Sequence, residues 1–270
     1  QIGLLTACGA DQVRVHRRPR VAILSNGDEL AGPSEFRRVL SGKAIPETNA
    51  PALAAAVTLA GGLPILMGIA RDRAEDILEK IDTAREAGAD VLLTSGGASL
   101  GEKDLIKRVL DEVGFELDFW RVKMRPGTPF SFGKLPEGGN GRPLPVFGLP
   151  GNPASSFVTF QILCRPFLLR LAGHERIHRP VVQARAGEVL RTRVDLTHFF
   201  RVRFRGDPGF PTVVLTGPQT SGLVRSQGLA HGLAVVPDGV ERIEEGETVR
   251  VILLDDLGLG MAEPGYLPGA

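Results

Sequence analysis

The chain has 270 residues, a net charge of +1 at neutral pH, and only one Trp, one Tyr and five His. This length suffices for about two domains with substantial cores. The near-neutral charge argues against a nucleic-acid-binding protein with a general basic surface, and the few His residues argue against a His-rich metal site. No apolar run reaches the ~20 residues of a membrane span. Cys8 and Cys164 are far apart, so we expect free thiols in a soluble, cytoplasmic protein.

The first part of the chain predicts two strands that end in acidic residues. Residues 1–18 read as a helix end and a short strand, 12–16, and are expected to be the remnant of a preceding segment. The apolar run 21–24 is typical of a buried parallel strand, and Asp28 and Glu29 follow its carboxyl end, where ligands collect in open α/β sheets. A solvated turn is the alternative for these acids.

The next elements are a helix, a strand and a second helix. Residues 31–41 are polar and irregular, and Asn49 is expected to cap a helix that reaches residue 60. Residues 63–69 predict the second strand. Asp72 follows this strand and forms a capping box with Glu75 ahead of a helix to residue 87, so capping alone would explain Asp72.

Residues 90–104, DVLLTSGGASLGEKD, organise the rest of the chain. The strand 91–93 leads into a glycine loop and then a helix, whose start the capping box of Ser99 and Glu102 places near residue 99. Backbone N–H groups of such a loop and the helix dipole favour a phosphate. Asp104, one turn into the helix, is suited to a divalent cation that bridges to this phosphate. The alternative is an ordinary tight turn of a doubly wound domain.

A cationic strand and a second phosphate loop complete the α/β part. Residues 115–125 predict a long strand that places Arg121, Lys123 and Arg125 on one face. After strands at 130–132 and 146–149, the turn 150–153 leads into a helix, 154–171, that Pro166 is expected to kink. Alternating strands and helices from residue 19 predict a three-layer α/β/α domain.

Beyond residue 179 the helical periodicity disappears, and short alternating runs separated by turns predict a small all-β, barrel-like domain. We therefore expect four segments: a remnant of an N-terminal segment (1–18), an α/β domain (19–177), a β domain (178–256) and a poorly ordered tail (257–270).

An ordered set of motifs resembles one enzyme family. The set is SNGDEL (25–30), IPETN (45–49), RD (71–72), TSGGASLGEKD (94–104), MRPGTPFSFG (124–133), LPGNPAS (149–155) and GPQTSG (217–222). In this order the motifs resemble the molybdopterin molybdenumtransferase family, which includes MoeA and the E domain of gephyrin. The resemblance implies insertion of molybdate into adenylylated molybdopterin with Mg²⁺, which releases AMP and gives molybdenum cofactor. It also implies a homodimer that forms through N-terminal segments absent from this chain, with molybdopterin adenylyltransferase and molybdoenzyme maturation proteins as further partners.

The resemblance also implies roles for individual residues. Glu29, Asp72 and Asp104 would be catalytic, with Asp72 and Asp104 holding the metal. Molybdate, a dianion, would be bound by Arg121, Arg125, Arg201 and Ser221. The nucleotide and pterin would be bound by Asp28, Ser95, Gly96, Gly97, Ser99, Gly101, Pro150, Gly151, Asn152, Pro153 and Ser155.

Three departures and two alternatives bear on this interpretation. Thr128 stands where many members have a lysine, Glu47 where they have a shorter acid, and the N-terminal segments are missing. Without the resemblance, Arg201 would be taken as an ordinary charge on a strand face. A molybdopterin adenylyltransferase-like enzyme would lack the β domain, and a non-catalytic scaffold like gephyrin would not need three acids at strand ends. Molybdate and tungstate, similar in size and charge, are equally compatible with the sequence.

Overall fold

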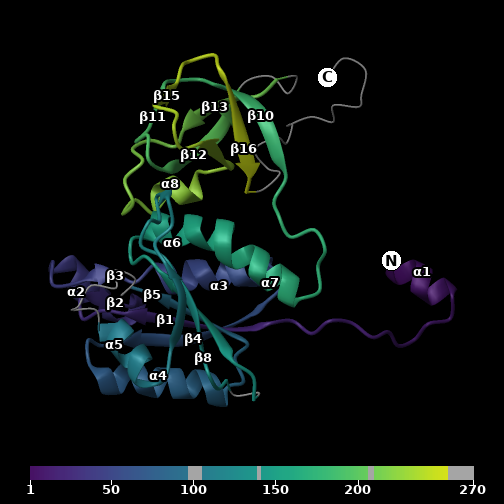
Figure 1. Cartoon of the computed structure of the whole chain (residues 1–270), viewed down its shortest axis with the longest axis vertical. Helices are drawn as coiled ribbons and strands as arrows, with labels where there is room; N and C mark the ends of the chain where they lie inside the picture. Colours follow the sequence, from purple (N-terminus) through teal and green to yellow (C-terminus); the bar gives the residue numbers. More distant parts are fainter. Residues whose placement is uncertain (97–104, 139–140, 206–209, 255–270) are drawn as a thin grey trace.

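The computed structural model describes residues 1–96, 105–138, 141–205 and 210–254. Its strands form a six-stranded sheet in the first part of the chain and a small closed barrel in the second (Figure 1). The predicted fold class, an α/β layer structure followed by a small all-β unit, is confirmed. Within the described ranges, no helix has the length and apolar character required to cross a membrane.

The first sheet has the strand order β4-β1-β5-β9-β8-β6. Strands β4, β1, β5 and β9 are parallel to one another, whereas β8 runs antiparallel to both of its neighbours. The strands span Leu63–Ala70 (β4), Arg20–Asn26 (β1), Val91–Ser95 (β5), Leu144–Leu149 (β9), Ser131–Leu135 (β8) and Glu116–Trp120 (β6). All four parallel strands therefore present their carboxyl ends at one edge of the sheet.

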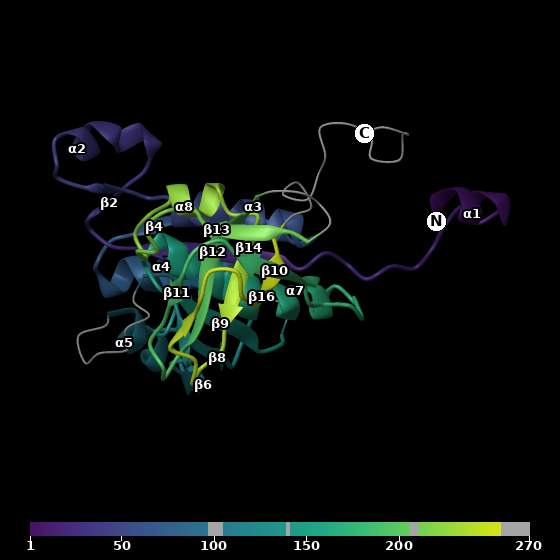
Figure 2. The ribbon, with the colours of Figure 1, turned by 90° about the horizontal axis from the view of Figure 1, so that it is seen from above.

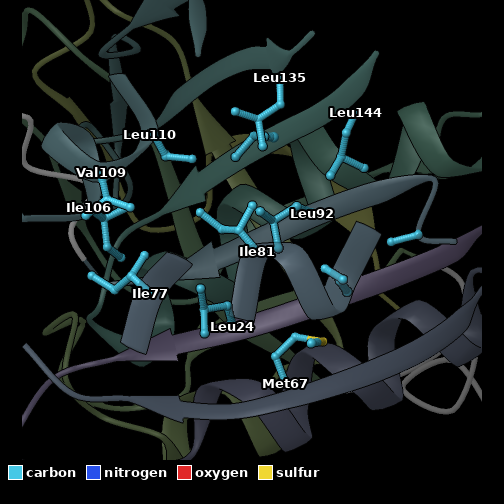
Figure 3. Close-up of a cluster of buried hydrophobic side chains, with 14 of the residues drawn as sticks. Leu24, Met67, Ile77, Ile81, Leu92, Ile106, Val109, Leu110, Leu135 and Leu144 are labelled. Atoms are coloured by element: carbon cyan, nitrogen blue, oxygen red, sulfur yellow. The ribbon is translucent and has the colours of Figure 1, made fainter. Parts of the chain in front are cut away.

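Helices cover both faces of this sheet because successive residues of its strands point to opposite faces. In β1, Ala22 and Leu24 pack on one face against α4 and α5, and Val21 and Ile23 pack on the other against α3 and the helices after β9. Figure 3 shows the first of these cores, where Leu24, Ile77 and Leu92 meet, and each such fully buried side chain contributes about 2 kcal/mol. The bounds are Asn49–Leu59 (α3), Ala74–Glu86 (α4), Leu105–Glu112 (α5), Pro153–Thr159 (α6) and Arg165–Leu171 (α7).

The helix that Pro166 was predicted to kink contains a widened turn ahead of this proline. A π-helical segment, Phe160–Cys164, separates α6 from α7 and ends just before this proline. Proline has no N–H to donate to the preceding turn, and a π turn accommodates the missing hydrogen bond.

The second part of the chain closes on itself. Strands follow the order β13-β10-β16-β14-β12, and β12 pairs with β13, so five strands form a barrel. Val202, Ala234 and Val251 lie in its core. The bounds are Val181–Ala186 (β10), Thr197–Arg205 (β12), Thr212–Leu215 (β13), Gly232–Val236 (β14) and Thr248–Leu253 (β16), with Leu190–Arg191 (β11), Arg242–Ile243 (β15) and the short helix Arg225–Gly228 (α8) outside the barrel.

One strand of the first part belongs to the barrel sheet. β7 (Met124–Arg125) pairs in parallel with β12, with Met124 opposite Thr197 and Arg125 opposite His198. The continuous strand predicted for residues 115–125 is therefore wrong. The backbone turns at Arg121, which has a φ of +66°, and the three cations do not share the face of one strand.

Two further predictions fail near the N-terminus. Residues 31–41 are not irregular: they contain a 3₁₀ turn, Pro33–Glu35, and α2, Phe36–Leu40, flanked by the paired strands β2 (Leu30–Ala31) and β3 (Ile45–Pro46). Residues 12–16 form no strand, because their alternating residues find no strand to pair with among the described residues. Figures 1 and 2 show α1 (Ile2–Ala7) and α2 projecting on opposite sides.

Candidate active site at the carboxyl edge of the sheet

The predicted acidic residues lie where neighbouring parallel strands end. Asp72 follows β4, and Asp28 and Glu29 follow β1, which is its neighbour in the sheet. The amide Nδ2 of Asn26 donates to Asp72 Oδ1 at 2.8 Å. The backbone N–H groups of Asp28 and Asp72 each donate to the other residue's carboxylate at 3.3 Å. The turns after β1 and β4 are therefore joined through Asp72.

These contacts overturn the capping interpretation of Asp72. Helix α4 begins at Ala74, its N-cap is Arg73, and no side chain caps it. The Asp72 carboxylate instead faces the turn after β1, because Asn26 and the N–H of Asp28 offer it donors there. Asp72 thus contributes its charge to the edge of the sheet.

The Glu29 carboxylate folds back over Gly27. A Cβ atom on Gly27 would lie 2.5 Å from Glu29 Oε2, and Gly27 has a φ of +147°. The positive φ favours glycine at this position. The exposed Glu29 carboxylate therefore lies next to the end of β1.

The prediction that Asn49 caps α3 is wrong. The N-cap position is Thr48, and Glu47 Oε1 accepts the N–H of Ala50 in the first turn at 2.8 Å and also the hydroxyl of Ser25 at 3.0 Å. Asn49 Nδ2 is left to donate to Ser95 Oγ and to the carbonyl of Gly151, each at 2.7 Å. Asn49 thereby joins the end of β5 to the turn after β9.

The turns after β1, β5 and β9 pack directly on one another at Gly96. Its φ is +100°, and a Cβ atom would lie 2.8 Å from the carbonyl oxygen of Asn26. The N–H of Gly96 donates to the Leu149 carbonyl at 3.3 Å, and Gly151 lies against its Cα. Ser95, Gly96 and Gly151, which were predicted to bind the nucleotide and pterin, are therefore adjacent. The remaining predicted residues of this loop, Gly97, Ser99, Gly101 and Asp104, lie outside the described residues, as does the predicted capping box.

A cavity of about 480 Å³ opens where the α/β part meets the barrel. Its lining comes from the turn after β7, the turn after β9, the first turn of α6 and two barrel segments. The N–H of Ala154 in α6 donates to the Ser221 carbonyl at 2.9 Å, which joins the two sides. The lining residues are Arg125, Pro126, Gly127, Thr128, Pro129, Pro150, Asn152, Ser155, Arg193, Leu196, Gln219, Thr220 and Ser221.

This lining has two arginines and several hydroxyls but no carboxylate, which makes it suited to an anion. The structure brings together Arg125, Asn152, Ser155 and Ser221, all predicted as ligand-binding. Sequence reasoning missed Arg193. It belongs to a segment between β11 and β12 that carries no motif, and only the barrel topology brings it to the cavity. Gln219 and Thr220 belong to the GPQTSG motif but were not singled out.

Arg201 lies behind the cavity wall. Its side chain is 1% exposed, so it is not an ordinary strand-face charge, and it is not among the residues that line the cavity, although it was predicted to bind molybdate. Nε donates to Ser226 Oγ at 2.9 Å and Nη2 to the Thr220 carbonyl at 3.1 Å. Burial lowers the pKa of Arg201 to about 10, and no carboxylate among the described residues pairs with it. The guanidinium thus supports the loop that presents Thr220 and Ser221.

The structure does not bring Arg121 to this cavity. Its guanidinium carbon lies 4.2 Å from the centre of the Trp120 ring, an attractive cation–π arrangement. The backbone N–H of Arg121 donates to the Phe130 carbonyl at 2.9 Å.

The acidic end of the site has the chemistry of a magnesium ligand set but not a complete cage. Within the described ranges, no three His, Cys, Asp or Glu residues converge. Mg²⁺ is commonly held by one or two carboxylates together with substrate phosphates and water, so such a cage is not required. Asn26 Oδ1, next to the Asp72 carboxylate, is buried without a hydrogen-bond partner. An unpaired carbonyl oxygen beside a carboxylate fits a hard cation.

Comparisons with known proteins agree with this architecture. Residues 22–170 match the family model described as a probable molybdopterin binding domain, and residues 183–254 match the MoeA C-terminal region (domain IV). The chain is 35% identical to a molybdopterin molybdenumtransferase of a Nostoc species, over 94% of this chain and 57% of the relative. It is 30% identical to molybdopterin molybdenumtransferase 1 of Mycobacterium tuberculosis, over 96% of this chain and 60% of the relative.

A solved structure shows the same fold. The molybdopterin biosynthesis MoeA protein from Pyrococcus horikoshii matches with a TM-score of 0.76 and 34% identity, over 94% of this chain and 59% of that one. The chain spans less than two thirds of the length of each of these relatives. The two family models follow each other in the order of the two structural parts described above, and the chain belongs to the MoeA family.

Proposed function

We propose that the protein is a molybdopterin molybdenumtransferase, which inserts molybdate into adenylylated molybdopterin in a Mg²⁺-dependent reaction and releases AMP. The observation that carries the proposal is a site with two ends of opposite charge. Asp28, Glu29 and Asp72 lie at one end, and a cavity with Arg125 and no lining carboxylate lies at the other. The glycine turns that carry Gly96 and Gly151 pack together between these ends, and a strand–glycine turn–helix arrangement favours a phosphate.

In this proposal residues 19–177 bind nucleotide and pterin, and residues 178–256 form the far wall of the anion cavity. The phosphate and pterin would lie along Ser95, Gly96 and the turn 150–153, which Asn49 holds together. Asp28, Ser155 and the loop residues Gly97, Ser99 and Gly101 complete this predicted set. Burial of the reacting phosphate between two domains would exclude competing water.

Asp72 and Asp104 would hold Mg²⁺, with Asn26 Oδ1 as an additional oxygen donor. When bound, this cation would neutralise charge on the phosphate that joins AMP to the pterin. Glu29, which lies beside the end of β1, would orient the group that reacts at that phosphate.

Molybdate would bind at the cationic end. Arg125 and Ser221 line the cavity, and Arg201 supports the Ser221 loop from behind. Guanidinium groups suit a dianionic tetrahedral oxyanion because they donate parallel hydrogen bonds. Arg121 stays a prediction, as do the homodimer, the cytoplasmic location and the protein partners.

The test is a reconstituted reaction with the natural full-length polypeptide. Adenylylated molybdopterin, molybdate and Mg²⁺ should give AMP and active cofactor. Asp72→Asn and Asp104→Asn should each lower AMP release at least about tenfold. Asp82→Asn is the matched control, because Asp82 is an exposed α4 residue paired with Arg85. A wild-type protein that releases no AMP would refute the proposed function. A wild-type rate in Asp104→Asn would refute the metal-holding role.

A further inference from the structure

The anion cavity has a second arginine in its lining. Arg193 and Leu196 belong to the segment between β11 and β12 and line the cavity together with Arg125 from the α/β part. The turn after β7 contributes no other charge: the Thr128 hydroxyl donates to the Met124 carbonyl within its own turn at 2.7 Å. A dianion in this cavity would therefore have one cation from each side of the domain junction.

The segment that carries Arg193 is held at both ends. The Thr192 N–H donates to the Glu241 carbonyl at 2.9 Å, and the Thr197 N–H donates to the Lys123 carbonyl at 3.0 Å. Between these points, the Gly239 N–H donates to the Val194 carbonyl at 2.6 Å. Arg193 is thus on a fixed turn, although its side chain reaches solvent.

His198 fixes the backbone of Arg193 itself. The Arg193 N–H donates to His198 Nε2 at 2.9 Å, which requires that Nε2 be unprotonated. The His198 ring is 5% exposed and lies 5.4 Å from the Phe200 ring. His198 is also the β12 register partner of Arg125, so His198 contacts the main chain of Arg193 and pairs with the strand that carries Arg125.

We propose that Arg193 is a second oxyanion-binding residue of this cavity, and that neutral His198 is the positioning residue that holds it there. The inference rests on the proposed function and deepens it. The charged groups that face His198 are Arg125, Arg193 and Asp195. Burial, followed by the positive charge of Arg125, lowers the pKa of His198, so its acceptor nitrogen is available at neutral pH.

The test is the affinity of the natural full-length polypeptide for molybdate, measured by calorimetry at pH 7.5. Arg193→Gln should weaken binding about tenfold or more, because a charge-assisted hydrogen bond is lost. Arg191→Gln is the matched control: Arg191 is an exposed β11 residue two positions away that does not line the cavity, and its loss should change affinity less than about twofold. In turnover, Arg193→Gln should raise the KM for molybdate and leave kcat nearly unchanged.

Two variants test His198. His198→Leu removes the acceptor and should weaken molybdate binding, whereas His198→Gln keeps an acceptor at the place of Nε2 and should restore it. Urea unfolding shows whether each variant is folded. If His198→Leu does not fold, His198→Gln alone tests the positioning role. A Gln variant that binds molybdate no better than Arg193→Gln overturns the positioning role.

The outcomes separate this inference from the proposed function. If the wild type binds molybdate and Arg193→Gln binds it equally well, the inference is overturned and the function stands. If the wild type binds no molybdate, the proposed function fails and the inference fails with it. Equal losses in Arg193→Gln and Arg191→Gln would show a general effect of charge and would also overturn the inference.

Discussion

Replacing Arg201 by Met should damage anion binding much more than folding. The Met side chain has a similar length and no charge, so it fills most of the space behind the Thr220–Ser221 loop. Two contributions to stability then oppose each other. Burial lowers the pKa of Arg201 from 12.5 to about 10, and at about 1.36 kcal/mol for each pH unit this corresponds to on the order of 3 kcal/mol of desolvation. The Met variant would no longer incur this penalty.

The opposing contribution comes from the hydrogen bonds that the guanidinium makes. Ser226 Oγ still donates to the Leu223 carbonyl at 2.9 Å after the substitution, so it stays partly satisfied. The Thr220 carbonyl loses the Nη2 donor, and an unsatisfied buried acceptor costs about 1–3 kcal/mol. The two contributions nearly cancel, and we expect the free energy of unfolding to change by about 2 kcal/mol or less.

For molybdate binding, no second contribution offsets the loss of the Arg201 charge. Removal of the buried positive charge should weaken molybdate binding about tenfold or more. Urea unfolding and calorimetric titration measure the two quantities on the same sample. Arg203→Met is the matched control, since Arg203 is an exposed neighbour on β12. Wild-type affinity in Arg201→Met would refute the electrostatic role, and a loss of stability above about 4 kcal/mol would refute the desolvation argument.

Three further predictions concern the turns and the buried imidazole. Asn49→Ala should lower the free energy of unfolding by about 1–2 kcal/mol, because it removes the two hydrogen bonds that join the turns after β5 and β9. Gly96→Ala should cost about 1–3 kcal/mol and weaken AMP binding, because its Cβ would lie 2.8 Å from a backbone oxygen at positive φ. For His198, burial lowers the pKa in the folded state below the ordinary 6.5, so the unfolded chain takes up a proton first. Stability should therefore fall as the pH drops below 6.5, by at most about 1.4 kcal/mol per pH unit from this group.

Each of these three predictions can be tested by a measurement, and each has a result that would contradict it. Urea unfolding tests Asn49→Ala, and a change below about 0.3 kcal/mol would contradict the bridging role. Gly228→Ala controls for Gly96→Ala, since a Cβ on Gly228 meets no atom within 4 Å and its φ is not positive; equal costs would contradict the argument from steric conflict. For His198, unfolding is measured from pH 8 to pH 5 in the wild type and in His198→Gln, and parallel curves would show that His198 does not carry the pH dependence.

The sequence predicts the layers and the edge at which ligands gather, because both depend on local patterns. The apolar run of β1 and the polar residues after it place Asp28 and Glu29 at the ends of parallel strands without any knowledge of the fold. The wrong predictions concern side chains that have more than one possible hydrogen-bond partner. Asn49 and Asp72 both have the residue type and position of a helix cap, but Glu47 accepts the first-turn N–H of α3 and Asn26 donates to Asp72. A local sequence pattern does not show which of these hydrogen-bond partners a side chain will bind.

The burial and position of side chains that depend on distant parts of the chain could not be predicted from the sequence for a different reason. Arg201 and Arg203 look alike in an alternating strand, but Arg201 is covered by the segment after β13, where it donates to Thr220 and Ser226, whereas Arg203 is exposed. Arg193 lies in a segment with no motif and reaches the cavity through the pairing of the barrel with β7.

The shared strand pair also restricts how the molecule can exchange its ligands. Because Met124 pairs with Thr197 and Arg125 with His198, a wide hinge motion between the two parts would have to break a β ladder and expose the apolar contact of Met124, Val158 and Leu233. Both losses oppose such a motion. A ligand of the cavity would then exchange through its mouth while the two parts stay joined, so loop and side-chain motions at the mouth, on a faster timescale than domain opening, would set the rate of exchange.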